Sequence, residues 1–137
     1  MPLVIHIHME TKKRLEAKNK MTIERLKTAI RLDKKIVLYI PATMGPAAAC
    51  DNSAAVSAAA AFLSGLFGGA TIQPGRGAWV SDSAGLVLED TTLVYAFTDA
   101  AGLQAGLDPV IDYAEKIKRE MLQEAVSLEI DGVLYII

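Results

Sequence analysis

The chain has 137 residues, a formal net charge of −2, 52 % hydrophobic residues and 22 % charged residues. This composition excludes a disordered chain, and the length suits one hydrophobic core. The single cysteine, Cys50, excludes an internal disulfide and any metal site built from several cysteines. It also favours a reducing compartment, and we expect a cytoplasmic protein without a signal peptide, cofactor or bound metal.

Charge is unevenly distributed along the chain. Residues 1–35 carry ten Lys or Arg and four Asp or Glu, whereas residues 36–137 carry four and twelve. A basic segment can bind nucleic acid or an acidic membrane surface, or it can complement the acidic remainder of the same protein. We favour the last alternative. Nucleic-acid binding is not expected, because no aromatic residue lies among these lysines to stack on bases.

The N-terminal 35 residues form the first predicted region, an arm with a basic amphipathic helix, and residues 36–137 form the folded domain. Residues 3–8 alternate weakly, so a strand there would place His6 and His8 on one face. Two imidazoles are not a metal site by themselves. Residues 10–35 contain neither Gly nor Pro, which predicts a helix with a narrow apolar stripe: Ile23, Leu26 and Ile30.

A short apolar run at residues 36–40 is typical of a buried central strand. The loop that follows, residues 41–52, is long for a connection between a strand and a helix, and such loops often carry function. Cys50 precedes the next helix, where the helix dipole can activate a thiol. A small, partly buried cysteine is the alternative that we favour.

Residues 53–67 form a predicted helix that carries no charge. A membrane span is not expected, because the helix is short and its Ala, Ser and Gly residues contribute little transfer energy. A helix that is apolar all round is buried on more than one side. We therefore expect one side to pack on the sheet and the other to form a homo-oligomer interface. Gly68 and Gly69 suit the left-handed C-cap of this helix.

A hairpin is predicted next, with strands at 70–80 and 86–97 and an interruption at Pro74–Gly77. Apolar residues at helical spacing then predict a helix over 108–122, with Asp108 as its N-cap and Pro109 in its first turn. Asp131-Gly132 is the signature of a two-residue hairpin turn near the C-terminus.

This order of elements predicts an α+β fold of the ferredoxin-like, split βαβ type. Such a fold has an antiparallel sheet with two helices on one face. Here it would gain an N-terminal helix and a C-terminal hairpin. The other sheet face would be covered by the N-terminal helix or by a second subunit.

Three segments resemble a small bacterial family of unknown function with the motifs F-x-G-G-x-T, G-x-G-x-W and Q-E-S/A-V. They are Phe-Gly-Gly-Ala-Thr at 67–71, Gly-Arg-Gly-Ala-Trp at 75–79 and Gln-Glu-Ala-Val-Ser at 123–127. The resemblance spans residues 62–130 and implies no activity. The chain is also similar to trimeric ferredoxin-like proteins of the divalent-cation-tolerance and nitrogen-regulatory group, which implies topology alone.

Four residues are candidate ligand-binding positions: Arg76, Trp79, Glu89 and Glu124. Arg76 lies between two glycines, where backbone N–H groups and a guanidinium can hold an anion. Glu89 and Glu124 can act as paired carboxylates in acid–base chemistry. Trp79 is either a ligand platform or an anchor of the core or an interface. No catalytic residue is assigned.

The sequence favours a non-enzymatic interaction or regulatory module, a homo-oligomer that binds a protein partner. Two alternatives remain open. One is a small-ligand or anion sensor with a pocket at the 41–52 loop and a bulge at residues 75–79. The other is a small enzyme of unassigned chemistry.

Overall fold

The computed structural model describes residues 3–46 and 48–137, which divide into a unit that ends at Arg31 and a unit Leu32–Ile137. The first contains helix α1 (Leu3–Arg25), whose described side chains are exposed. Residues 3–8 do not form a strand, because this segment begins the helix. The possible pair of His6 and His8 cannot be placed, since the side chain of His6 lies outside the described residues.

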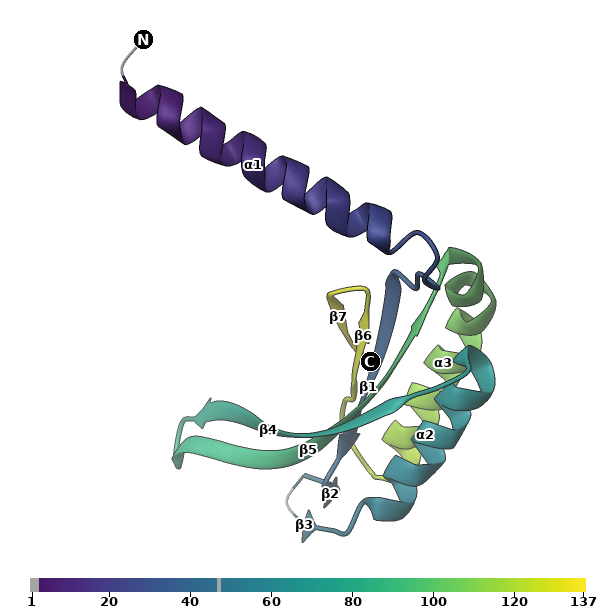
Figure 1. The fold of residues 1–137 in the computed structure, drawn as a ribbon. Helices are drawn as coiled ribbons and strands as arrows, with labels where there is room; N and C mark the ends of the chain where they lie inside the picture. Colours follow the sequence, from purple (N-terminus) through teal and green to yellow (C-terminus); the bar gives the residue numbers. More distant parts are fainter. Residues whose placement is uncertain (1–2, 47) are drawn as a thin grey trace. The chain divides into compact units, whose positions relative to one another are not determined.

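The second unit is an antiparallel sheet in the strand order β4-β5-β1-β6-β7 (Figure 1). Helices α2 and α3 pack on one of its faces. The prediction of a ferredoxin-like α+β fold with an extra N-terminal helix and a C-terminal hairpin is confirmed. The elements of this unit are β1 (Lys34–Pro41), β2 (Thr43–Met44), β3 (Ala48–Ala49), α2 (Ser53–Phe67), β4 (Thr71–Ser81), β5 (Gly85–Thr98), α3 (Ala100–Glu120), β6 (Ser127–Ile130) and β7 (Val133–Ile136).

The hydrophobic core lies between the sheet and the two helices. Alternate residues of β1 point toward the helices, and Leu38 is paired with Val94 of β5 and Leu128 of β6. All three side chains are buried. They pack with apolar side chains from α2 and α3, including Leu63 and Val110. The period of two along β1 thus decides which side chains enter the core.

Helix α2 has the bounds that its uncharged sequence predicts, and Gly68 is its C-cap. The backbone φ of Gly68 is +88°, and its N–H donates to the carbonyl oxygen of Ser64 at 2.8 Å. This left-handed position favours glycine. Among the described residues, no helix is long and apolar enough to cross a membrane.

Helix α3 begins eight residues earlier than predicted. The carboxylate of Asp99 accepts a hydrogen bond from the N–H of Gly102 at 2.8 Å, so Asp99 is the N-cap. Pro109 lies inside the helix, and the assignment of Asp108 and Pro109 to its N-terminus is wrong. A proline inside a helix has no N–H, so one backbone hydrogen bond is lost. Packing of the buried face of α3 against the sheet offsets this loss.

Strands β4 and β5 form a long hairpin whose distal part, residues 76–90, extends away from the helices (Figure 1). From here on we call residues 76–90 the arm; this segment is distinct from the predicted N-terminal arm of residues 1–35. The predicted interruption at Pro74–Gly77 is wrong, because pairing continues through it, with Pro74 opposite Thr92 and Gly77 opposite Glu89. β4 is an edge strand, and the missing N–H of a proline is tolerated on the free side of such a strand.

The C-terminal hairpin is confirmed, and it adds β7 to the sheet beside β6. Asp131 and Gly132 have φ values of +50° and +84°. Positive φ at both central residues is what a type I′ turn requires. On the face of this sheet opposite α2 and α3, Phe97 is 45 % exposed and Ile136 is 72 % exposed.

Candidate functional site

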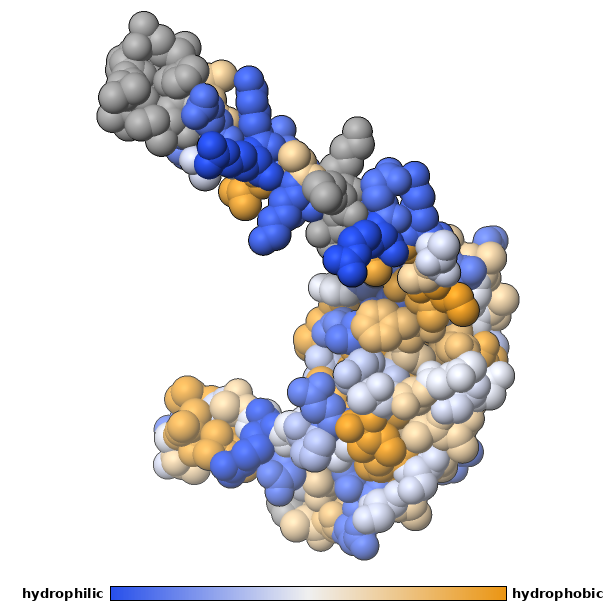
Figure 2. Space-filling model, in the orientation of Figure 1, coloured by the Kyte–Doolittle hydropathy of each residue, from blue (hydrophilic) through white to orange (hydrophobic). Residues whose placement is uncertain are grey.

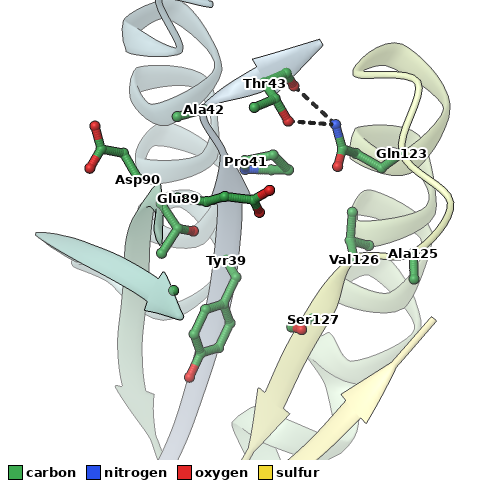
Figure 3. Close-up of a pocket in the computed structure, with 12 residues that line it drawn as sticks. Tyr39, Pro41, Ala42, Thr43, Glu89, Asp90, Gln123, Ala125, Val126 and Ser127 are labelled. Carbon is green, nitrogen blue, oxygen red and sulfur yellow. Dashed lines mark hydrogen bonds between the residues drawn. The ribbon is translucent and has the colours of Figure 1, made fainter. Parts of the chain in front are cut away.

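A hollow of about 240 Å³ lies where the arm leaves the sheet (Figure 3). The end of β1, the start of the loop after it, β5 and the connection between α3 and β6 all contribute walls. We call it the Tyr39 pocket. The residues that line it are Tyr39, Pro41, Ala42, Thr43, Gly77, Glu89, Asp90, Thr91, Gln123, Ala125, Val126 and Ser127.

Gln123 joins two walls of the Tyr39 pocket. Its side-chain Nε2 donates to the carbonyl oxygens of Thr43 at 3.0 Å and Gly45 at 3.2 Å. It also lies 3.0 Å from the carbonyl oxygen of Met121. Leu122 places Gln123 there by adopting a left-handed backbone with a φ of +54°. The loop after β1 and the end of α3 are thereby held together.

Tyr39 supplies a half-buried phenol to the same pocket. Its hydroxyl donates to Oε1 of Glu129 at 3.2 Å. Burial raises the pKa of Tyr39, and the charge of Glu129 and this hydrogen bond raise it further. The phenol therefore stays protonated at neutral pH and acts as a donor.

The raised pKa of Tyr39 predicts a loss of stability at alkaline pH. A tyrosine whose pKa is higher in the folded chain than the unfolded value of about 10 stabilises the fold fully below that value, and the contribution is lost as the pH rises through the folded pKa. The difference in unfolding free energy between wild type and Tyr39→Phe should therefore stay constant up to about pH 9 and shrink as the pH rises above about 10. Urea unfolding measures it, and a difference independent of pH contradicts the assignment.

The pocket lining carries carboxylates. Among the residues that the structure describes, no Lys, Arg or His lines the pocket, whereas Glu89 and Asp90 do. Asp90 pairs with Arg76, with 3.5 Å between Oδ1 and Nε. Within residues 3–46 and 48–137, no ion pair to Glu89 is found. Glu89 is thus the carboxylate of this pocket that remains available to a ligand.

A second hollow of about 540 Å³ lies between the 41–52 loop and the start of the arm, and Cys50, Asn52, Gly75 and Arg76 line it. It occupies the place predicted for a sensor pocket, although β4 has no bulge there. Asn52 holds its wall by donating to the carbonyl oxygen of Pro41 at 3.1 Å. Cys50 is partly buried.

The four predicted ligand-binding residues are dispersed. Glu89 lines the Tyr39 pocket, and Arg76 lines the second hollow. Trp79 lies farther along the arm and is 51 % exposed. Glu124 is exposed in the connection after α3 and does not line either hollow. The structure therefore does not pair Glu89 with Glu124 in one hollow.

Two pocket residues, Tyr39 and Gln123, were missed by the sequence analysis. Tyr39 was assigned to an apolar strand, where nothing marks it as functional. Gln123 opens the Gln-Glu-Ala-Val-Ser segment, and that motif is the one available signal. Among the described residues, no group of three or more His, Cys, Asp or Glu is placed to hold a metal ion.

No family model and no curated protein matches the chain, so its resemblance to the small bacterial family stays a prediction. Two solved structures share the fold. A phage SAM lyase in complex with S-methyl-5′-thioadenosine is 17 % identical with a TM-score of 0.57, and the match covers 81 % of this chain and 95 % of that chain. A phage SAM lyase in the apo state is also 17 % identical, with a TM-score of 0.55 and coverages of 77 % and 89 %.

These structures correct the functional expectation. The prediction of a non-enzymatic interaction or regulatory module is contradicted, because both solved structures, which match over 95 % and 89 % of their own length, are described as a phage SAM lyase. The enzyme alternative is the better supported one. At 17 % identity the likeness itself establishes the fold and not the reaction.

Proposed function

We propose that the chain is an enzyme that cleaves a carbon–sulfur bond of S-adenosylmethionine (SAM) or a closely related sulfonium nucleoside, releasing S-methyl-5′-thioadenosine. The observation that carries the proposal is the Tyr39 pocket, which has the available carboxylate Glu89 and no cationic side chain from the described part of the chain. The fold likeness to a SAM lyase supports the choice of substrate.

The chemistry of a sulfonium suits this pocket. When the carbon–sulfur bond breaks, its electron pair passes to sulfur, and the positive sulfonium leaves as a neutral thioether. The leaving group therefore needs no proton and no cationic side chain beside it. The remaining carbon fragment completes its valence by losing a neighbouring proton to a base or by closing onto its own carboxylate. In both cases Glu89 attracts the cationic substrate.

Incubation of the protein with SAM tests the proposal. We expect SAM to be consumed and S-methyl-5′-thioadenosine to appear in equal amount, measured by liquid chromatography with mass spectrometry. Heat-denatured protein serves as the control for the spontaneous decay of SAM. A folded protein that converts SAM no faster than this control contradicts the proposal.

We further propose that the chain works as a homo-oligomer. The outer face of α2 exposes small side chains, including Ala54, Ser57 and Ala58, as expected for an interface. The arm adds a larger apolar surface, because Val80 is 78 % exposed and Leu86 is 65 % exposed. In Figure 2, hydrophobic residues gather at the tip of the arm. Two-stranded hairpins are marginal in water, so a second copy is the partner we propose for this surface.

Light scattering tests the assembly. We expect the wild-type mass in solution to be a multiple of 14.7 kDa. The double variant Val80→Lys/Leu86→Lys should shift the mass toward one chain, because a buried lysine without a partner opposes association. Ser83→Lys at the turn of the same hairpin is the matched control. A monomeric wild type, or equal masses for both variants, argues against the arm as an interface.

A further inference from the structure

The side-chain amide of Gln123 has a defined orientation. Its nitrogen lies within 3.2 Å of the carbonyl oxygens of Thr43, Gly45 and Met121. Carbonyl oxygens only accept hydrogen bonds, so the NH₂ group faces them and the amide cannot be flipped. Oε1 is thereby directed away from these carbonyls. Figure 3 shows it on the side of the amide that faces the pocket.

The partners of Gln123 make this orientation rigid. The N–H of Gly45 donates to the carbonyl oxygen of Met121 at 2.8 Å, which ties the same two segments through their backbones. Nε2 also lies 3.4 Å from the hydroxyl oxygen of Thr43. A ligand that enters the pocket therefore meets an acceptor oxygen that is already in place, and little side-chain ordering remains to be done on binding.

The charge of the pocket narrows the kind of group that fits. Glu89 provides a negative charge, Gln123 provides a neutral acceptor, and no Lys, Arg or His of residues 8–19, 23–46 and 48–137 lines the pocket. A primary ammonium is complementary to this set, because it is a cation with three N–H donors. The volume of about 240 Å³ is below the typical range of about 300–1,000 Å³ for pockets that enclose a whole drug-sized ligand. It suits one end of a nucleoside substrate.

We propose that Oε1 of Gln123, together with Glu89, binds the α-ammonium at the amino-acid end of the substrate. Gln123 is then a specificity-determining residue, which distinguishes an amino-acid-bearing nucleoside from one without the amine. The assignment rests on the proposed function, since that function supplies the nucleoside. The nitrogen of the same amide holds the pocket wall, so Gln123 has a structural role as well.

Two ligands that differ only in the α-amine distinguish the substrate-binding role of Gln123 from its structural role. The first is S-adenosylhomocysteine, which carries the α-ammonium but no sulfonium, and the second is its deaminated analogue, 4-(5′-deoxyadenosylthio)butyrate. Isothermal titration gives the affinity of each for wild type and Gln123→Met. Gln73→Met, at an exposed glutamine of β4, is the matched control. A hydrogen bond to a charged group corresponds to about 10- to 100-fold in affinity.

We expect wild type and Gln73→Met to bind the amine-bearing ligand about 10- to 100-fold more tightly than the analogue. In Gln123→Met this preference should disappear, with the affinity for the analogue changed by less than about threefold. Equal weakening of both ligands overturns the inference, because it reveals a structural role alone.

The wild-type protein provides an independent measurement in case Gln123→Met does not fold, which circular dichroism checks. Binding of both ligands by wild type without a preference for the amine overturns the inference and leaves the proposed function standing. Binding of neither ligand contradicts the proposed function itself.

Discussion

Replacement of Glu89 by Gln is expected to lower kcat/KM for SAM cleavage by about 100-fold or more. Glu89 is the carboxylate of the Tyr39 pocket that has no cationic partner among the described residues, whereas Asp90 already pairs with Arg76. The amide keeps the shape of the side chain but loses the charge that attracts a sulfonium. Because Glu89 is exposed, the free energy of unfolding should change by less than about 0.5 kcal/mol.

Steady-state kinetics and urea unfolding measure the two expectations for Glu89→Gln. Asp82→Asn is the matched control, since Asp82 is an exposed carboxylate in the turn of the same hairpin. It removes one negative charge from the arm without changing the pocket lining, and its activity should equal that of wild type. Comparable activity in Glu89→Gln and wild type would place the reaction elsewhere on the protein.

Replacement of Leu38 by Ala is expected to lower the free energy of unfolding by about 2–5 kcal/mol. Leu38 is 1 % exposed and lies in the central strand between β5 and β6. Its removal leaves a cavity between the sheet and both helices, which the neighbouring side chains can fill only in part. Since small domains have total stabilities of about 5–15 kcal/mol, the loss is a large fraction of the whole.

Denaturant unfolding followed by circular dichroism measures the effect of Leu38→Ala. Ile136→Ala is the comparison, because Ile136 lies in the same sheet but is 72 % exposed in the single chain. Measured on dilute protein, this second variant should lose less than about 1 kcal/mol. Equal losses in the two variants would contradict the placement of the core on the helix side of the sheet.

The elements predicted best from sequence are those that local signals specify completely. Helix α2 ends at Phe67 because Gly68 adopts the left-handed conformation of a C-cap directly after the alanine-rich helix. The turn at Asp131-Gly132 needs two positive φ values, which this residue pair adopts readily. The C-cap and the turn depend only on residues that are adjacent in sequence, so those residues are enough to locate them.

Two elements differ from the prediction, β4 because tertiary pairing overrides a local signal and α3 because a second local signal begins the helix earlier. Pro74 and the glycines after it indicate an interruption, yet pairing with β5 carries the edge strand through them. Pro109 resembles a residue of the first helical turn, but the cap formed by Asp99 begins α3 nearer to β5. In both cases the stabilising contacts come from elsewhere in the fold or from a competing cap, and residue preferences alone do not reveal them.

The candidate site was predicted only in part because its residues are distant in sequence. Glu89 was identified as a lone carboxylate in the hairpin. Gln123 gains its role from the carbonyl oxygens of the loop after β1, which lie nearly 80 residues away. Tyr39 gains its role from Glu129 on the neighbouring strand. No spacing rule connects such positions, so the pocket becomes visible only when the sheet is assembled.

Titration of ¹⁵N-labelled protein with S-adenosylhomocysteine, which carries the amino-acid end of the substrate, tests the central claim most directly, since it locates the ligand residue by residue. We predict saturable changes in the amide signals of three segments that form the Tyr39 pocket, residues 42–43, 89–91 and 123–127. Signals of the outer face of α3, such as those of Asp112 and Lys116, should not move. Saturable changes confined to other segments, or no change at all, would contradict the assignment of the Tyr39 pocket as the site for the amino-acid end of the substrate.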